Sequence, residues 1–220
     1  MDSNTNSYPA SLEVDYQAKH DRMTTFFRII CVIPIFIILA LLTGGGGSEG
    51  LMESSGGEMS QNGGGMAGGL GLMGGLCVAT ALMIIVRQRY PRWWFDFALE
   101  LNRFSARVGA YLFLLTDQYP STVEKQSVQL DVAYPDVEKD LNKWLPLVKW
   151  FLAIPHYIVL GLLTVAAVLV TVLAWFTILF TGRYPKELFD FVVGVGRWHL
   201  RVYVYAFLLT TDQYPPFSLK

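Results

Sequence analysis

The stretch RYPRWWFDFALELNRFSARVGAYLFLLTDQYP, residues 89–120, occurs a second time in this chain. The second version is RYPKELFDFVVGVGRWHLRVYVYAFLLTTDQYP, residues 183–215. The two align without a gap as far as residues 116 and 210, and continue to match after one inserted threonine. Because self-similarity over this length indicates a repeated structural unit, we assign the flanking segments to one copy or the other.

The composition indicates a membrane protein. Of the 220 residues, 53% are hydrophobic and only 16% are charged, whereas soluble domains average about 25% charged residues. The mean hydropathy is +0.38. A net charge of -1 gives no electrostatic reason to expect a nucleic-acid partner, so we exclude one. Cys31 and Cys77 lie inside apolar runs and are expected to be small core residues.

A short segment with strand character precedes each copy. Residues 11–16 and residues 128–134 alternate apolar and polar side chains, which is typical of half-buried strands. Leu12 corresponds to Leu130 in this alignment. Two isolated strands are only marginally stable, so we expect them to pair with each other or with another extended segment such as the C-terminal tail.

Apolar runs predict two membrane hairpins. The first joins spans at about 26–42 and 70–88 through a Gly-rich outward loop at 43–69. In the second half, residues 147–181 are apolar without a polar break, and one helix of that length would be about 52 Å long. We therefore expect a tight hairpin near residues 161–165, with spans at about 145–163 and 166–182. The resulting repeats are 8–120 and 121–220.

The distribution of basic residues predicts the orientation. All 17 Lys and Arg lie outside residues 43–86. Basic segments are retained on the cytoplasmic side of a membrane, so both termini and the linker 121–146 are expected there. This gives a multi-pass protein of a bacterial inner membrane. The first apolar run has no clear cleavage site behind it, and we expect it to be a retained span.

The repeated stretch predicts an amphipathic helix in each copy, at about 94–116 and 186–210. At 100° per residue, the charged side chains fall on one narrow arc of each helix. We call these six residues the charged ridges: Asp96, Arg103, Arg107, Asp190, Arg197 and Arg201. We favour helices lying in the cytoplasmic interface, while helices that cross the membrane with the arc facing a bundle interior stay open as the alternative.

Two roles are open for the charged ridges. Salt bridges within or between the helices are the simpler one, because unpaired buried charge is costly. Alternatively, the arginines bind lipid phosphate or the carboxylates of a partner, for which guanidinium geometry is suited. Trp93, Trp94 and Trp198 are expected to be interface anchors.

The second copy closely resembles the bacterial membrane family called domain of unknown function 4389 (DUF4389). The resemblance rests on its Arg-Tyr-Pro, Phe-Asp-Phe, Arg-Trp, Arg-Val and Tyr-Pro-Pro-Phe-Ser-Leu elements, and we expect two tandem copies. The first copy departs at Glu100 and Asn102, which replace glycines, at Phe104, which replaces a tryptophan, and at residues 121–122. No established activity comes with this resemblance.

These features predict an all-α integral membrane protein with minor β structure. It is a tandem duplication in which each repeat is a strand, a two-helix transmembrane hairpin and an interfacial helix, with a pseudo-twofold axis along the membrane normal. We find no catalytic motif, metal cluster or cofactor signature. The expected function is a non-enzymatic scaffold or accessory subunit that engages lipid or a membrane protein through its cytoplasmic face.

Two other functions stay open. The first alternative is a small channel or transporter with a path at the repeat axis. An enzyme of lipid metabolism is third, with Asp96, Asp190 and His199 as acid–base candidates. The bilayer, an anionic lipid, a membrane protein and a second copy of the chain are the partners considered.

Overall fold

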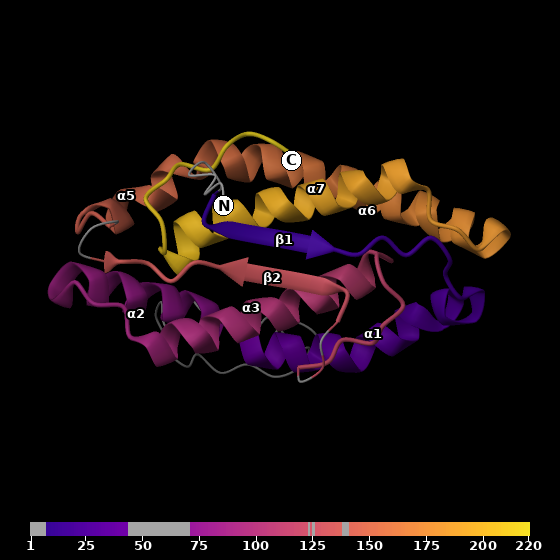
Figure 1. Ribbon diagram of the computed structural model, residues 1–220, viewed down its shortest axis with the longest axis horizontal. Coiled ribbons are helices and arrows are strands. Elements are labelled where there is room, and N and C mark those ends of the chain that lie inside the picture. The colour runs from indigo at the N-terminus through magenta and orange to yellow at the C-terminus, as the bar shows by residue number, and fades with distance from the viewer. Residues whose placement is uncertain (1–7, 44–70, 123, 125, 138–140) are drawn as a thin grey trace, which may run out of the picture.

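The chain forms three layers, which the computed structural model shows for residues 8–220 apart from 44–70, 123, 125 and 138–140 (Figure 1). A pair of strands forms the first layer, two long helices lie beneath it, and the remaining helices form the third layer. In chain order the described elements are β1 (Ala10–Val14), α1 (Arg22–Thr43), α2 (Gly71–Arg87), α3 (Arg92–Leu112), β2 (Val128–Val132), α5 (Leu145–Leu152), α6 (Ile154–Thr181), α7 (Lys186–Tyr203) and the π-helical turn η1 (Val204–Leu208).

The two strands pair with each other. β1 runs antiparallel to β2, and Leu12 lies opposite Leu130 at the centre of the ladder. Side chains of β2 alternate between buried and exposed positions, as expected of a sheet with one covered face and one face in water. α7 covers β1, and α3 covers β2. The alternation in the sequence therefore predicted both strands, and the structure shows that they pair with each other, which is one of the two alternatives left open.

Prolines and buried leucines delimit the middle helices. α3 follows Pro91 and α7 follows Pro185, both in extended conformation with φ near -62° and -61°. Proline fixes this φ and is well tolerated where a helix begins. At the other end, Leu114 and Leu209 adopt φ values of 62° and 58°, which disfavour a non-glycine residue. Both leucine side chains are buried, and this burial offsets the backbone strain.

The predicted hairpin near residues 161–165 is wrong. These residues lie inside α6, a single helix that runs without interruption from Ile154 to Thr181. It ends at Gly182, whose φ of 71° and N–H···O bond to Ile178 at 2.7 Å form a glycine C-cap. The apolar run 147–181 is not one helix, because it is divided at Ala153 between α5 and α6. α6 alone has 28 residues and is about 42 Å long at a rise of about 1.5 Å per residue.

The predicted fold class is also wrong. Among the described residues, α6 is the one continuous helix long and apolar enough to cross a membrane. α1 qualifies as a span only if its two parts, Arg22–Arg28 and Ile30–Leu39, are counted together across a bend of 54°. Pro34 lies close to this bend, and a proline ring disrupts the preceding helical turn. The apolar part of α2, Cys77–Arg87, is shorter. The sequence predicted four spans in two hairpins about an axis along the membrane normal. The described helices, with one or at most two candidate spans, do not fit that prediction.

The amphipathic helices are not interfacial in this fold. α3 and α7 lie between the strands and the outer helices, so each buries one face beneath a strand and another against α1 or α6. The charged ridges of α3 and α7 lie on the sides of these helices that are next to the strands, where Arg103 contacts β2 and Arg197 contacts β1. The Gly-rich loop predicted at 43–69 lies, apart from Thr43, outside the described residues.

The outer helices expose a wide surface of apolar side chains, which we call the apolar face. Its largest exposed members on α1, α2, α5 and α6 are Met23, Phe26, Ile30, Ile33, Ile37, Leu82, Val86, Leu147, Phe151, Ile158, Leu162, Val165, Leu169, Leu173 and Phe180. Within the most apolar window of α6, only 17% of the residues are buried. A core helix of a soluble protein would be mostly buried, so α6 has the exposure expected of a helix in contact with lipid.

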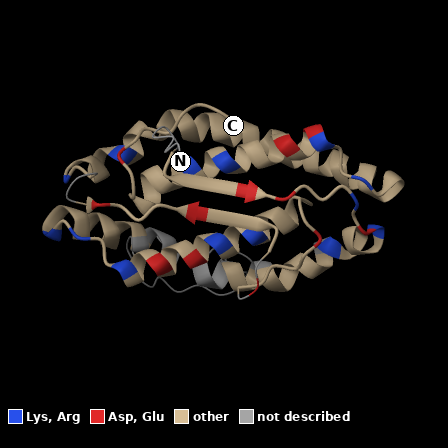
Figure 2. Ribbon diagram, viewed as in Figure 1, with Lys and Arg blue, Asp and Glu red and all other residues tan. Residues whose placement is uncertain are grey.

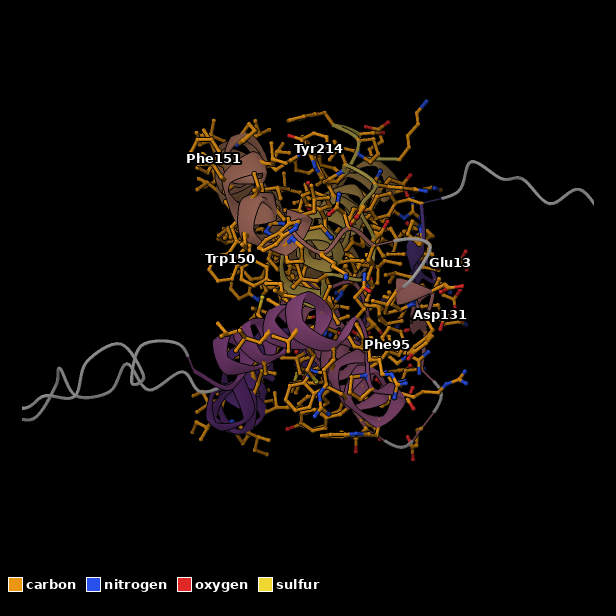
Figure 3. The ribbon with its side chains drawn as sticks, turned by 90° about the vertical axis from the view of Figure 1, so that its left-hand side faces the viewer. Glu13, Phe95, Asp131, Trp150, Phe151 and Tyr214 are labelled. Carbon is orange, nitrogen blue, oxygen red and sulfur yellow. The ribbon has the colours of Figure 1, made fainter. Side chains whose placement is uncertain are left out.

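Charged residues are few on the helices that carry the apolar face: Arg22 and Arg28 on α1, Arg87 on α2, Lys149 on α5 and none on α6. Figure 2 shows Lys, Arg, Asp and Glu along α3, α7 and the connections at both ends of the molecule. Figure 3 shows Trp150 and Phe151 on one side of the molecule and Glu13 and Asp131 on the opposite side. The chain therefore has an apolar face formed by the outer helices and, on the opposite side of the molecule, a polar face formed by the two strands.

Candidate functional site

The arginine at the centre of each charged ridge caps a strand. Arg103 donates from Nε to the carbonyl oxygen of Leu130 at 2.9 Å. Arg197 donates from Nε to the carbonyl oxygen of Leu12 at 3.0 Å. Unpaired backbone groups on an edge strand invite pairing with another chain, so these two guanidinium groups satisfy acceptors at the outer edges of the sheet.

The outer nitrogens of Arg103 are also engaged. Nη1 lies 2.7 Å from Glu100 Oε1, and Nη2 lies 2.5 Å from Asp131 Oδ1. Burial of the Arg103 side chain acts to lower its pKa, but the hydrogen bonds and charges of these two carboxylates raise the pKa above its ordinary value. The group is thus a charged link between α3 and β2.

The second arginine of each ridge binds an extended segment. Arg107 donates from Nη1 to the carbonyl oxygen of Ser121 at 2.5 Å. Arg201 is buried and donates from Nη2 to the backbone oxygens of Ser218 and Lys220, at 2.8 and 2.5 Å. These contacts hold the segments that follow the two repeated stretches against α3 and α7.

The aspartates of the ridges lie apart from these arginines. Asp96 is exposed and forms no ion pair with any residue that the structure describes. Asp190 pairs with Lys186, one helical turn away, at 2.8 Å, and both side chains are more than half exposed. The structure therefore does not bring the six ridge residues into one cluster.

The three tryptophans occupy different environments. Trp93 is exposed, and Trp94 is half-buried and donates from Nε1 to Thr80 Oγ1 at 2.9 Å. Trp198 is buried and donates from Nε1 to His156 Nδ1 at 3.1 Å. Of the three, Trp93 has the exposure that contact with a membrane surface requires.

Gly194 is the point where the C-terminal segment approaches α7 most closely. A Cβ atom added there would lie 2.7 Å from the backbone oxygen of Leu219 and 3.0 Å from its Cβ. We expect Gly194→Ala to displace this segment, weaken its contacts with Arg201, and lower the free energy of unfolding by about 1–3 kcal/mol. Thermal unfolding in mild detergent, with hydrogen exchange of residues 216–220, measures the effect.

Gly161→Ala is the matched control, since nothing lies within 4 Å of a Cβ added at that position in α6. Alanine favours a helix over glycine by up to about 1 kcal/mol, so this variant should be as stable as the parent or more so. Equal unfolding temperatures and equal hydrogen exchange of residues 216–220 in the two variants would show that the C-terminal segment does not pack against Gly194.

Two buried cations were not identified as site residues from the sequence. Arg28 is 3% exposed, forms an ion pair with Asp117, and donates from Nη1 to the carbonyl oxygen of Tyr111 at 3.0 Å. Lys149 is fully buried, with Nζ 2.7 Å from Asp212 Oδ1 and 2.8 Å from the carbonyl oxygen of Thr211. Each cation joins an outer helix to the C-terminal end of a repeated stretch.

The first of these pairs belongs to a larger network. Asp117 accepts hydrogen bonds from Gln17 Nε2 at 3.1 Å and from the backbone N–H of Asp21 at 3.0 Å, and lies 2.9 Å from His20 Nδ1. Burial acts to raise the pKa of Asp117, but these hydrogen bonds and the charges of His20 and Arg28 lower the pKa below its ordinary value. The carboxylate therefore stays ionised and links three segments of the chain.

The second pair is a simpler one. Burial lowers the pKa of Lys149, and Asp212 acts in the opposite direction. Asp212 also accepts from the backbone N–H of Asn142 at 2.6 Å. The repeated Thr-Asp-Gln-Tyr-Pro sequence at 116–120 and 211–215 is the signal that could have revealed both carboxylates.

A pocket of about 420 Å³ lies beneath the strands. Leu12 and Leu130 cover it, α3 and α7 form its sides, and α6 contributes Thr164 and Ala167. Of the described side chains that line it, none is charged, and the polar ones are Ser105, Thr164, His199 and Tyr203. Such apolar, partly enclosed spaces are the usual form of small-molecule sites.

The described residues hold no group of three or more His, Cys, Asp or Glu side chains that could bind a metal ion. The buried polar network at Asp117 contains one histidine, His20, whose Nε2 has no hydrogen-bond partner among the residues that the structure describes. The pocket and the apolar face are two features of the described residues that offer room for another molecule.

Residues 146–218 match the model of a domain of unknown function, DUF4389. This segment contains most of α5, all of α6, α7 and η1, and the C-terminal segment held by Arg201. The match covers one copy, so the expected second copy in the first half is not confirmed. No curated protein and no solved structure matches the chain.

Proposed function

We propose that the protein is a membrane-associated scaffold or accessory subunit without a catalytic role, bound to the bilayer through the apolar face. The observation that carries this proposal is the width of that face, which runs over α1, α2, α5 and α6. Exposed apolar patches larger than a few hundred Å² are rare on soluble monomers. Lipid is the partner that satisfies such a surface over several helices at once.

The polar sheet face supports this orientation. Glu13 and Asp131 lie on the opposite side of the molecule from Trp150 and Phe151 of α5. In the proposed arrangement this face is in water and available to a partner protein. The ridge arginines already bind strand and tail carbonyls, so lipid contact rests on the apolar face rather than on the ridges.

Vesicle flotation tests the proposal. The purified chain should float with vesicles of phosphatidylethanolamine and phosphatidylglycerol and should resist extraction with alkaline carbonate. The double variant Leu162→Asp/Leu169→Asp places two charges on the exposed side of α6. Each charge costs about 2.5–3.5 kcal/mol in hydrocarbon, so the fraction bound should fall at least tenfold.

Gln129→Asp is the control, because it adds a charge to the exposed side of β2. This variant should float like the parent chain. A double α6 variant that floats equally well would remove the apolar face as the site of membrane contact.

We further propose that residues 8–120 carry a diverged second copy of the matched domain, in the cytoplasmic membrane of a bacterium. Paired contacts support the duplication. Arg103 and Arg197 cap Leu130 and Leu12, and Tyr134 and Tyr16 donate from their hydroxyls to the carbonyl oxygens of Tyr90 and Tyr184. An experimental structure that contains only one member of each of these pairs of contacts would contradict the duplication. The location rests on the family resemblance.

A further inference from the structure

We propose that the pocket between α3 and α7 binds one hydrocarbon chain, supplied by a free fatty acid or by the acyl chain of a membrane lipid. Its volume of about 420 Å³ falls within the range of roughly 300–1,000 Å³ that is usual for small-molecule sites. Protein interiors otherwise contain few voids larger than a water molecule. A space of this size beneath the sheet is therefore more typical of a ligand site than of a packed protein interior.

Small residues create the space. Ala106, Gly109 and Ala110 line it from α3, and Gly196 lines it from α7. A Cβ atom added at Gly109 would meet nothing within 4 Å, whereas one at Gly196 would lie 3.3 Å from Leu12 Cδ2. The pocket therefore has free space beside Gly109, whereas Leu12 limits the space beside Gly196.

The wall selects for hydrocarbon. The hydroxyl groups of Ser105 and Thr164 are already bonded within their own helices, Ser105 Oγ to the carbonyl oxygen of Leu101 at 2.8 Å and Thr164 Oγ1 to that of Leu160 at 2.7 Å. The third hydroxyl, that of Tyr203, interacts with the side chain of Asn102. No charged side chain lines the pocket among the described residues. A polar ligand would lose its hydration without compensation, while an apolar cavity of about 150 Å³ already suffices to bind benzene.

The position of α6 indicates where the chain comes from. Thr164 and Ala167 face the pocket, while Leu162 and Val165 of the same turns are exposed on the apolar face. One helix therefore separates the pocket from the surface proposed to contact lipid. His199, which is exposed and also lines the pocket, is the polar residue positioned to meet a carboxylate or a headgroup at the opening.

Binding of cis-parinaric acid, a fluorescent fatty acid, tests the proposal on the full chain in amphipol after lipid removal. Saturable binding near one molecule per chain is expected. Gly109→Phe should weaken this binding at least tenfold without lowering the melting temperature, since the ring fills empty space. Gly161→Phe adds the same ring to the outer side of α6 and should bind like the parent.

Competitors distinguish the source of the chain. Displacement by palmitate alone supports a free fatty acid, and displacement by dipalmitoyl phosphatidylglycerol as well supports the acyl chain of a lipid. Displacement by glycerol 3-phosphate, which has no chain, would overturn the proposal. So would the absence of saturable binding, or equal binding by the two phenylalanine variants.

Two further measurements keep the outcomes separate. If Gly109→Phe does not fold, Ala106→Leu fills the same pocket with a smaller side chain and carries the same expectation. Gly109→Phe should also float with vesicles like the parent chain, because the apolar face is intact. Loss of chain binding with normal flotation thus tests the pocket independently of the membrane proposal.

Discussion

Asp117→Asn is expected to lower the free energy of unfolding by about 3 kcal/mol, because it leaves the Arg28 guanidinium buried beside a neutral partner. Arg28 is 3% exposed and its partner carboxylate is 17% exposed. The same carboxylate accepts hydrogen bonds from Gln17 and from the backbone of Asp21, so the variant weakens the junction between the N-terminal segment, α1 and the end of α3. Denaturant unfolding in mild detergent, followed by tryptophan fluorescence, measures the loss.

Asp190→Asn is the matched control. Asp190 also pairs with a cation, Lys186 at 2.8 Å, but its side chain is 56% exposed. Exposed ion pairs contribute about 0–1 kcal/mol, so this variant should stay close to the parent. A loss at Asp117 no greater than that at Asp190 would show that burial of the Arg28 pair contributes nothing to stability.

The contribution of Asp117 should depend on pH in a defined direction. Its pKa is lowered in the folded chain, so the folded state binds fewer protons than the unfolded state as this group titrates. The stabilisation is therefore fully present above the unfolded pKa of about 4 and is lost as the pH falls through the folded value. The difference in unfolding free energy between parent and Asp117→Asn should be constant near neutral pH and shrink below about pH 4.

Periodicity in the sequence was sufficient for the strands but not for the outer helices. The alternation in residues 11–16 and 128–134 arises because one side of each strand is covered and the other is in water. In residues 147–181 both sides of the helix are apolar, so no polar stripe marks which side packs on α7. The buried positions Leu160, Ala167, Ala174 and Ile178 are as apolar as exposed positions such as Leu162 and Leu169. A length rule for bilayer spans therefore placed a turn inside a continuous helix.

The charged ridges show a different limit of sequence-based reasoning. Helical spacing placed Arg103 and Arg107 on one arc, but their acceptors are backbone carbonyls 27 and 14 residues away in the chain. A carbonyl acceptor leaves no signature in side-chain composition. The partners of Arg28 and Lys149 are farther away in the chain, with 89 residues from Arg28 to Asp117 and 62 from Lys149 to Thr211, although the repeated Asp-Gln-Tyr-Pro sequence marks their carboxylates. The sequence did not predict the pocket. Its space exists because several lining residues are Gly or Ala, and such small residues also occur at ordinary packed positions.

Lys149→Met is expected to lower the free energy of unfolding by about 3 kcal/mol, because it removes the cation of a buried ion pair and leaves the carboxylate unpaired. The substitution keeps the length and apolar stem of a side chain that is fully buried, but removes the ammonium that lies 2.7 Å from Asp212 and 2.8 Å from the carbonyl oxygen of Thr211. Asp212 is then left 22% exposed without a cation. Lys186→Met, at an exposed ion pair, is the control and should stay within about 1 kcal/mol of the parent.

The double variant Lys149→Met/Asp212→Asn separates the ion pair from the packing around it. Burying two charges is costly in itself, and replacing both members of a buried pair often restores stability that a single replacement removes. The amide introduced by Asp212→Asn keeps an oxygen that can accept from the backbone N–H of Asn142. The double variant should therefore lose less than the sum of the single losses, with a coupling energy of about 2 kcal/mol. Strict additivity of the two losses would mean that Lys149 and Asp212 stabilise the fold independently, Lys149 through its bond to Thr211 and Asp212 through its bond to Asn142.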